Sequence, residues 1–310
     1  MIDFLYVVID KISNYKLKLK LYKWLGYFAN LLIRIDCNVV KSFCHQKGVS
    51  DFDNNPKIIA SLTSFPARIN HVHYTINTLL NQTVKPDRII LWLSQEQFTS
   101  IDELPYNLKK LQSRGLEIRL ESDDLRSHKK YYYAFSEFKN DIVITFDDDL
   151  IYPTYTIENL INKHKEFPTS ICCNRGHEIM LTDGEIAPYD EWKKEANHLT
   201  LPTHFLCPTG CGGVLYPPVS MPDETLNVQM FKNCAFLADD LWLKTMSIIN
   251  GTQAVYTDSF PQWLFVVDGS QSETLASSNV AMHQNDMVIK SLSAYYPRML
   301  EVLTGNDDAI

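Results

Sequence analysis

The chain has 310 residues, of which 45% are hydrophobic and 12% aromatic, and it contains no internal repeat or low-complexity segment. This composition predicts a globular protein with a sizeable core and excludes a disordered or fibrous chain. The net charge of −8 is uneven, because residues 1–50 carry eight Lys and Arg against three Asp, whereas residues 51–310 carry 21 Lys and Arg against 34 Asp and Glu. An acidic body argues against a nucleic-acid partner, which would need positive charge on the folded domain.

The seven cysteines are scattered without framework spacing, which predicts free thiols in a reducing compartment. Cys207 and Cys211 have ligand-like spacing, but no second Cys or His pair accompanies them, so we interpret them as small residues beside a turn. The N-terminus lacks a signal-peptide pattern, and no apolar run is long enough to span a bilayer. We therefore expect a cytoplasmic protein.

Residues 16–35 combine helical apolar spacing with a cluster of lysines at the start. The apolar positions are Leu21, Trp24, Leu25, Phe28, Leu31, Leu32 and Ile35, and the lysines are Lys16, Lys18, Lys20 and Lys23. This pattern predicts a basic amphipathic helix. The helix either packs on the domain or lies peripherally on the inner face of the cytoplasmic membrane. The pattern stops near residues 48–56, so we expect a helical segment over 1–50 and one domain over 51–310.

The domain begins with alternating strand and helix patterns. Strand-like apolar runs occupy residues 57–63, 86–94, 116–122 and 141–146, and helical patterns occupy residues 71–82, 104–115 and 129–140. A helix near 154–165, a strand at 170–174, loop-rich sequence, a helix at 239–251 and a strand at 253–257 follow. Continuous apolar strands separated by helices predict an α/β fold with a mainly parallel sheet covered on both faces.

Three aspartates, Asp147, Asp148 and Asp149, directly follow the fourth predicted strand in "VITFDDDLIYP". Ligands of such sheets bind at the carboxyl ends of the strands. Adjacent carboxylates repel one another, so they raise their pKa values or recruit a cation. Since alternate side chains of a strand point the same way, we expect Asp147 and Asp149 to hold one Mn²⁺ or Mg²⁺. The alternative is an Asp-rich surface turn.

An ordered series of motifs accompanies these aspartates. It comprises "IIASLTSFPARI", "NQTVKPDRIILWLS", "VITFDDDLIYP", "CGGVLYP" and "LADDLWL", over about residues 57–290. The series resembles the GT-A class of nucleotide-sugar glycosyltransferases, particularly bacterial polysaccharide enzymes related to glycosyltransferase family 2. This resemblance implies a GT-A (Rossmann-like) fold and metal-dependent transfer of a sugar, with a UDP-sugar favoured as donor. The implied acceptor is a hydroxyl of a surface glycan (capsule, O-antigen or lipooligosaccharide), free or lipid-linked, and inversion at the sugar is implied.

The resemblance also implies roles for individual residues. The nucleotide-sugar contacts would be Thr63, Ser64, Arg68, Lys129, Lys130, Asp148, Gly212 and Gly213. Hydroxyl and cationic groups suit a ribose and a diphosphate, although Arg68 could instead pair with a surface acid. Asp240 would be the general base, supported by Asp239, unless the pair only caps a helix. His283 would join Asp147 and Asp149 as a metal ligand.

Two other classes stay open. A haloacid-dehalogenase-type phosphatase also carries Asp-x-Asp after an apolar strand, but that motif normally follows the first strand, whereas here it follows the fourth. A non-catalytic nucleotide-sugar-binding scaffold of a polysaccharide assembly complex is the other alternative. The acidic pair Asp239 and Asp240 argues against the scaffold.

Overall fold

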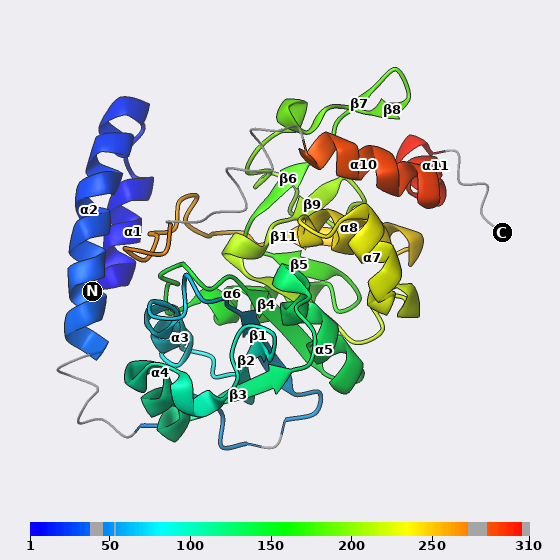
Figure 1. The fold of residues 1–310 in the computed structure, drawn as a ribbon. Coiled ribbons are helices and arrows are strands. Elements are labelled where there is room, and N and C mark those ends of the chain that lie inside the picture. The colour runs from blue at the N-terminus through cyan, green and yellow to red at the C-terminus, as the bar shows by residue number, and fades with distance from the viewer. Residues whose placement is uncertain (38–45, 53, 272–283, 306–310) are drawn as a thin grey trace.

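The protein, in a computed structural model that describes residues 1–37, 46–52, 54–271 and 284–305, is built around one seven-stranded sheet (Figure 1). The strand order is β11-β5-β10-β4-β1-β2-β3. The strands are β1 (Ile58–Thr63), β2 (Arg88–Ser94), β3 (Leu116–Glu121), β4 (Ile142–Phe146), β5 (Ile171–Cys173), β10 (Val214–Tyr216) and β11 (Ala254–Tyr256). Strand β10 runs antiparallel to both of its neighbours, and the other pairs are parallel. The prediction of a mainly parallel α/β sheet is confirmed.

Helices and two short antiparallel ribbons surround this sheet. The helices that follow β1 are α3 (Val72–Leu79), α4 (Tyr106–Lys110), α5 (Lys129–Glu137), α6 (Thr156–Glu166), α7 (Val228–Cys234), α8 (Asp239–Ile249), α10 (Gln284–Tyr295) and α11 (Arg298–Thr304). The ribbons pair β6 (Gly176–Glu178) with β9 (Leu206–Pro208), and β7 (Leu181–Thr182) with β8 (Glu185–Ile186). Both ribbons lie in the part of the chain that we expected to be loop-rich.

The side chains of β1 show why its sequence is continuously apolar. Ile59 packs in a cluster with Ala134 of α5, whereas the next residue, Ala60, belongs to another cluster with Ile76 of α3. All four side chains are completely buried. Because successive side chains of a strand point to opposite faces, a sheet covered on both faces needs apolar residues at every position.

Two N-terminal helices, α1 (Ile2–Asp10) and α2 (Tyr15–Ile35), lie side by side at the opposite side of the molecule from α10 and α11 (Figure 1). They are attached to the segment 264–268, which itself pairs with residues 149–151 after β4. The hydroxyl of Tyr6 donates to the carbonyl of Ile151, and the side chain of Asn30 donates to the carbonyl of Val266 at 2.9 Å. The helices therefore pack on the domain.

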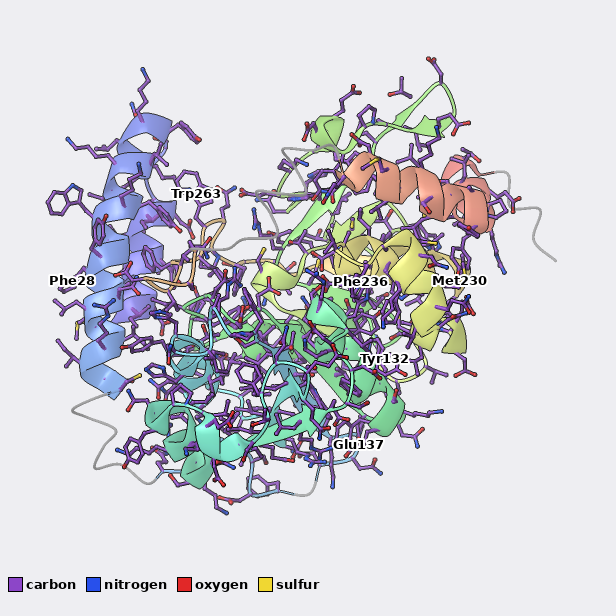
Figure 2. All side chains as sticks on the ribbon, in the orientation of Figure 1. Phe28, Tyr132, Glu137, Met230, Phe236 and Trp263 are labelled. Atoms are coloured by element: carbon purple, nitrogen blue, oxygen red, sulfur yellow. The ribbon has the colours of Figure 1, made fainter. Side chains whose placement is uncertain are left out.

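Only part of the apolar stripe predicted for α2, namely Leu25 and Leu32, packs against the core. Ala29 and Ile33 are the buried apolar residues of α2, whereas Trp24, Phe28 and Leu31 are 69%, 44% and 53% exposed. Phe28 lies on the side of the helix that is turned away from the rest of the molecule (Figure 2). Helix α2 thus packs by a narrower face and leaves an aromatic and aliphatic stripe in solvent.

None of the helices in the described part of the chain is long and apolar enough to cross a membrane. After the helices, the backbone N–H groups of Gly48 and Ser50 donate to the carbonyls of Arg114 and Pro86, each at 2.8 Å. The division into a helical segment over 1–50 and a domain over 51–310 stays a prediction.

Candidate active site

Asp147, Asp148 and Asp149 begin directly after the last residue of β4, at the carboxyl end of the central parallel strands. Their side chains differ in exposure, at 32% for Asp147, 7% for Asp148 and 15% for Asp149. The backbone N–H of Asp147 donates to the hydroxyl of Tyr152 at 3.0 Å, which holds the turn. Asp147 is therefore the carboxylate of the three that is most open to a ligand.

Arg68, in the loop between β1 and α3, neutralises two of the three aspartates. Its Nη1 lies 2.6 Å from Asp148 Oδ1, and its Nη2 lies 3.1 Å from Asp149 Oδ2. The hydroxyl of Ser64 donates to Asp148 Oδ2 at 2.5 Å. Burial raises the pKa of Asp148, and the charge of Arg68 opposes that rise. Strand alternation, which would place Asp147 and Asp149 on one side, ends with β4, and Asp148 and Asp149 share one guanidinium.

Asp149 has a second partner from a distant part of the sequence. The side-chain amide of Gln271 donates to Asp149 Oδ2 at 2.8 Å. Burial raises the pKa of Asp149 to about 6, although the charge of Arg68 opposes the rise. This carboxyl group consequently exchanges its proton close to neutral pH.

Lys130, in the first turn of α5, connects the two acidic motifs. Its Nζ lies 2.8 Å from Asp147 Oδ1 and 2.9 Å from Asp239 Oδ2, and its side chain is 5% exposed. Burial alone would lower the pKa of Lys130, but Asp147, Asp239 and Asp240 raise it well above the ordinary value. Burial would likewise raise the pKa of Asp239, and the charge of Lys130 lowers it below the ordinary value.

Asp240 lies beside Asp239 in the first turn of α8. The backbone N–H of Gly210 donates to both of its carboxylate oxygens, at 3.2 and 3.3 Å. Burial, followed by the neighbouring charge of Asp239, raises the pKa of Asp240 to about 7. Ala238, rather than either aspartate, occupies the N-cap position of α8. The two neighbours thus differ in protonation behaviour, as expected for one ion-paired carboxylate and one poised to accept a proton.

Three glycines near these groups meet different neighbours. A Cβ atom on Gly210 would lie 2.8 Å from Lys130 Nζ and 2.9 Å from Asp147 Oδ1. The corresponding atoms on Gly212 and Gly213 would meet Arg175 and Phe146. Gly210 therefore lies against the acidic site, whereas the predicted nucleotide-sugar contacts Gly212 and Gly213 approach neighbouring elements of the fold.

Two other predicted nucleotide contacts have partners in the protein. The hydroxyl of Thr63 donates to the carbonyl of Trp92 at 2.8 Å, and buried Lys129 forms an ion pair with Asp124. His283, the predicted third metal ligand, lies outside the described residues. The structure thus brings Ser64, Arg68, Lys130 and both acidic motifs together, while Lys129 is directed to the loop after β3.

The donor set at the aspartates suits a hard divalent cation that shares its coordination with a ligand. In the described ranges, no three His, Cys, Asp or Glu side chains converge as a complete metal site. Mg²⁺ usually takes only one or two carboxylates and completes its shell with water and phosphate oxygens. Asp147 and Asp149 would supply two oxygen ligands of this kind, so the chemistry of these residues fits a metal held together with a diphosphate.

Sequence reasoning missed two residues that complete this region. Gln271 bonds Asp149, and Arg175 contacts the loop of Gly210 through Cys211, since its Nη1 lies 2.7 Å from Cys211 Sγ. Neither Gln271 nor Arg175 stands in a recognisable motif. Gly210 was visible in "TGCGGVLYPP", but its closeness to Lys130 depends on the tertiary fold.

The fold and the matching family define a glycosyltransferase of the GT-A class. Residues 68–215, just under half of the chain, match the model of Glycosyl transferase family 2. No curated protein matches the sequence. The recognition of a GT-A enzyme related to family 2 is confirmed.

Two solved structures show remote likeness. Staphylococcus aureus TarS 1–349 in complex with UDP has a TM-score of 0.42 and 11% identity, over 66% of this chain and 58% of that one. The mannosyltransferase PcManGT from Pyrobaculum calidifontis, in complex with GDP-Man and Mn²⁺, has a TM-score of 0.47 and 10% identity, over 100% and 88% of the two chains. The chain therefore spans little more than half of the TarS fragment.

Proposed function

We propose that the protein transfers a hexosyl group from a nucleotide diphosphate sugar, with UDP as the favoured nucleotide, to a hydroxyl of a bacterial surface glycan. The observation that carries this proposal is the bridge of Lys130 between Asp147 and Asp239. This bridge brings the acidic residues after β4, which face the donor, close to the acidic pair of α8, which contains the base for the acceptor. Both parts are needed for displacement at a sugar carbon.

Asp240 is the proposed general base. Its pKa of about 7 allows it to be deprotonated at neutral pH and still take the proton of an attacking hydroxyl. Asp239, held as a carboxylate by Lys130, positions Asp240 and favours its protonation by like charge. Attack assisted from the side opposite the nucleotide gives inversion at the sugar.

Asp147 and Asp149 are proposed to hold Mg²⁺ or Mn²⁺, with His283 as a further candidate. When bound, the metal would supply positive charge to the diphosphate leaving group. Lys130 and Arg68 contribute fixed positive charge beside the same carboxylates. Ser64 and Arg68 hydrogen-bond Asp148 and orient it. They would therefore act on the nucleotide through Asp148 as well as by contacting it themselves.

We further propose that α2 contacts the inner face of the cytoplasmic membrane peripherally. Trp24, Phe28 and Leu31 are exposed on one side of α2, and the exposed Lys16, Lys20 and Lys23 lie on the same helix. Interfacial helices combine such aromatic and aliphatic residues with lysines that attract anionic lipid headgroups.

Titration with nucleotide sugars tests the transferase proposal. Thermal unfolding of the intact chain would be followed with UDP- and GDP-sugars, each with and without Mn²⁺. We expect one donor to raise the unfolding temperature in a metal-dependent way, because a ligand of the native state stabilises it. Asp149→Asn should remove the metal dependence and keep the unliganded unfolding temperature close to that of the native chain. Full metal-dependent transfer by Asp149→Asn would refute the metal assignment, and a product of retained configuration would refute Asp240 as the inverting base.

A further inference from the structure

An apolar groove separates α2 from the segment 260–266. It has a volume of about 360 Å³ and is lined by Leu19 and Tyr22 of α2, by Leu150 and by most of the segment 260–266. A separate, more polar hollow of about 510 Å³, with Lys18 and Glu195 in its lining, shares Gln262 and Trp263 with the groove. Trp263 lies between the N-terminal helices and the body of the molecule (Figure 2).

The inner end of the groove reaches the proposed active site. Leu150, Cys211 and Arg175 form this end. Leu150 follows Asp149 directly, and Cys211 follows Gly210, whose backbone N–H bonds Asp240. A molecule in the groove would therefore present its polar end beside the general base.

Arg175 lies at that inner end with an incomplete set of partners. Its Nη1 donates to Cys211 Sγ at 2.7 Å, its Nη2 is 3.6 Å from the carboxylate of Glu195, and its buried Nε has no hydrogen-bond partner among the described residues. A guanidinium ordinarily binds carboxylate or phosphate oxygens through two parallel hydrogen bonds. With a thiol on Nη1 and a carboxylate 3.6 Å from Nη2, Arg175 still has its Nε–H to donate to a phosphate oxygen.

The groove is open to solvent beside α2. Leu19 lines the groove and is itself 40% exposed. An apolar chain that enters beside Leu19 would therefore find an apolar path toward Cys211. The volume of the groove, about 360 Å³, falls within the range of about 300–1,000 Å³ that is typical of ligand pockets.

We infer that the acceptor is a glycan joined to a lipid through a phosphate. Its apolar chain would lie in this groove, and its phosphate would lie on Arg175. This inference rests on the proposed transferase function and names the acceptor class for the same site. The glycan end of such an acceptor would extend from Arg175 past the Gly210 loop to Asp240. The combination of an apolar groove and one cation at its inner end fits an amphiphile with a single anionic group better than it fits a free oligosaccharide.

Calorimetric titration of the full chain with farnesyl monophosphate tests the inference, with farnesol and inorganic phosphate as comparison ligands. We expect farnesyl monophosphate to bind most tightly. Arg175→Gln should weaken farnesyl monophosphate about tenfold or more, since it removes a charge-assisted hydrogen bond, and should change farnesol binding by less than about threefold. Arg175→Lys, which keeps the positive charge, should weaken farnesyl monophosphate binding less than Arg175→Gln does. Thermal unfolding of each variant checks that the fold is intact.

Two leucines of α2 provide a matched pair for the apolar part. Leu19 lines the groove, whereas Leu17, which is 53% exposed, does not. Leu19→Glu should weaken farnesyl monophosphate and farnesol alike, and Leu17→Glu, which adds the same charge, should weaken neither. Equal effects of the two changes would overturn the inference. It would also be overturned if inorganic phosphate bound as tightly as farnesyl monophosphate, or if Arg175→Gln weakened farnesol as much as the phosphate.

The titration also separates this inference from the proposed function. Binding of farnesyl monophosphate with the expected variant pattern, in a protein that binds no nucleotide sugar, would support the groove and remove the transferase assignment. Nucleotide-sugar binding without any binding of farnesyl monophosphate would keep the transferase assignment and overturn the lipid-linked acceptor.

Discussion

The Nζ of Lys130 lies 2.9 Å from the carboxylate of Asp239, and the two side chains are 5% and 10% exposed. The same amino group also contacts Asp147, so one buried cation serves acidic residues from the end of β4 and from the start of α8. Removing one partner of a buried ion pair leaves an uncompensated charge and is strongly destabilising. Lys130 therefore positions the two acidic motifs relative to each other and also stabilises the fold.

Lys130→Gln should lower the free energy of unfolding by about 3–5 kcal/mol at pH 8. In the native protein, Lys130 depresses the pKa of Asp239, so the pair contributes stability above the unfolded pKa of about 3.9 and loses it as the pH falls through the folded pKa. The difference between the native chain and the variant should accordingly persist down to about pH 4 and shrink below it. Urea unfolding at pH 8, 4 and 3 measures it.

Lys163→Gln is the matched control for that experiment. Lys163 is also buried and also contacts two carboxylates, those of Glu166 and Asp258, at 2.9 and 2.7 Å. These carboxylates are 53% and 65% exposed, so water can replace the lysine, and we expect a loss of at most about 1 kcal/mol. Equal losses for the two lysine variants would contradict the bridging role of Lys130.

Asp240→Asn should retain donor binding and reduce turnover by about 10²–10⁴-fold, the usual contribution of a general base. In the native enzyme, kcat/KM should decrease as the pH falls below about 7, because a protonated Asp240 cannot accept the acceptor's proton. Steady-state kinetics from pH 5 to 9 measures this profile. A profile that stays flat through pH 7 would assign the base to another group.

Asp240→Asn should also change the stability of the protein, and here the substitution should be favourable although it lowers turnover. Burial and Asp239 raise the folded pKa of Asp240, so ionising it disfavours the native state as the pH rises from about 4 to 7. Asp240→Asn removes this penalty, and the variant should gain stability relative to the native chain over that pH range. If the free energy of unfolding of the native chain instead exceeded that of the variant by the same amount at every pH, Asp240 would not titrate with a raised pKa.

The strands of the sheet could be predicted from sequence because a parallel sheet buried on both faces requires continuous apolar runs. The run in β1 reflects Ile59 and Ala60 on opposite faces, and the run in β4 ends where Asp147 begins. Local pattern and tertiary environment agree at these positions. The motif of Asp147, Asp148 and Asp149 was recognisable for a related reason, since charges directly after a buried strand are uncommon.

The contacts of the site could not be predicted, because they join residues far apart in sequence. Arg68 bonds Asp148 and Gln271 bonds Asp149, and no periodicity indicates either pair. The case of α2 is different, since its spacing correctly predicts a helix but not how much of the apolar stripe is covered. Asn30 hydrogen-bonds the segment 264–268 and fixes the rotation of the helix, which leaves Trp24 outside.

Gly210→Ala should reduce transfer by at least about tenfold. The added methyl group would lie 2.8 Å from Lys130 Nζ and 2.9 Å from Asp147 Oδ1, so the buried ion pair must separate to make room. Overpacking of this kind usually costs about 1–3 kcal/mol of stability. Gly26→Ala in α2 is the control, because its methyl group would make an ordinary contact of 3.6 Å with Phe265 and replace a helical glycine. Activity of Gly210→Ala equal to that of Gly26→Ala would show that the site tolerates the methyl group.

The double change Trp24→Ser and Phe28→Ser should abolish association with anionic vesicles while leaving the fold intact. Both side chains face solvent, so their removal should change the free energy of unfolding by no more than about 0.5 kcal/mol each. The native chain should sediment with phosphatidylglycerol vesicles, less with phosphatidylcholine vesicles, and less at 1 M salt, which screens the lysines of α2. Tyr106→Ser removes an aromatic side chain that is 73% exposed on α4 and should leave sedimentation unchanged. Unchanged sedimentation of the double variant would instead mean that the exposed stripe of α2 does not contact the lipid.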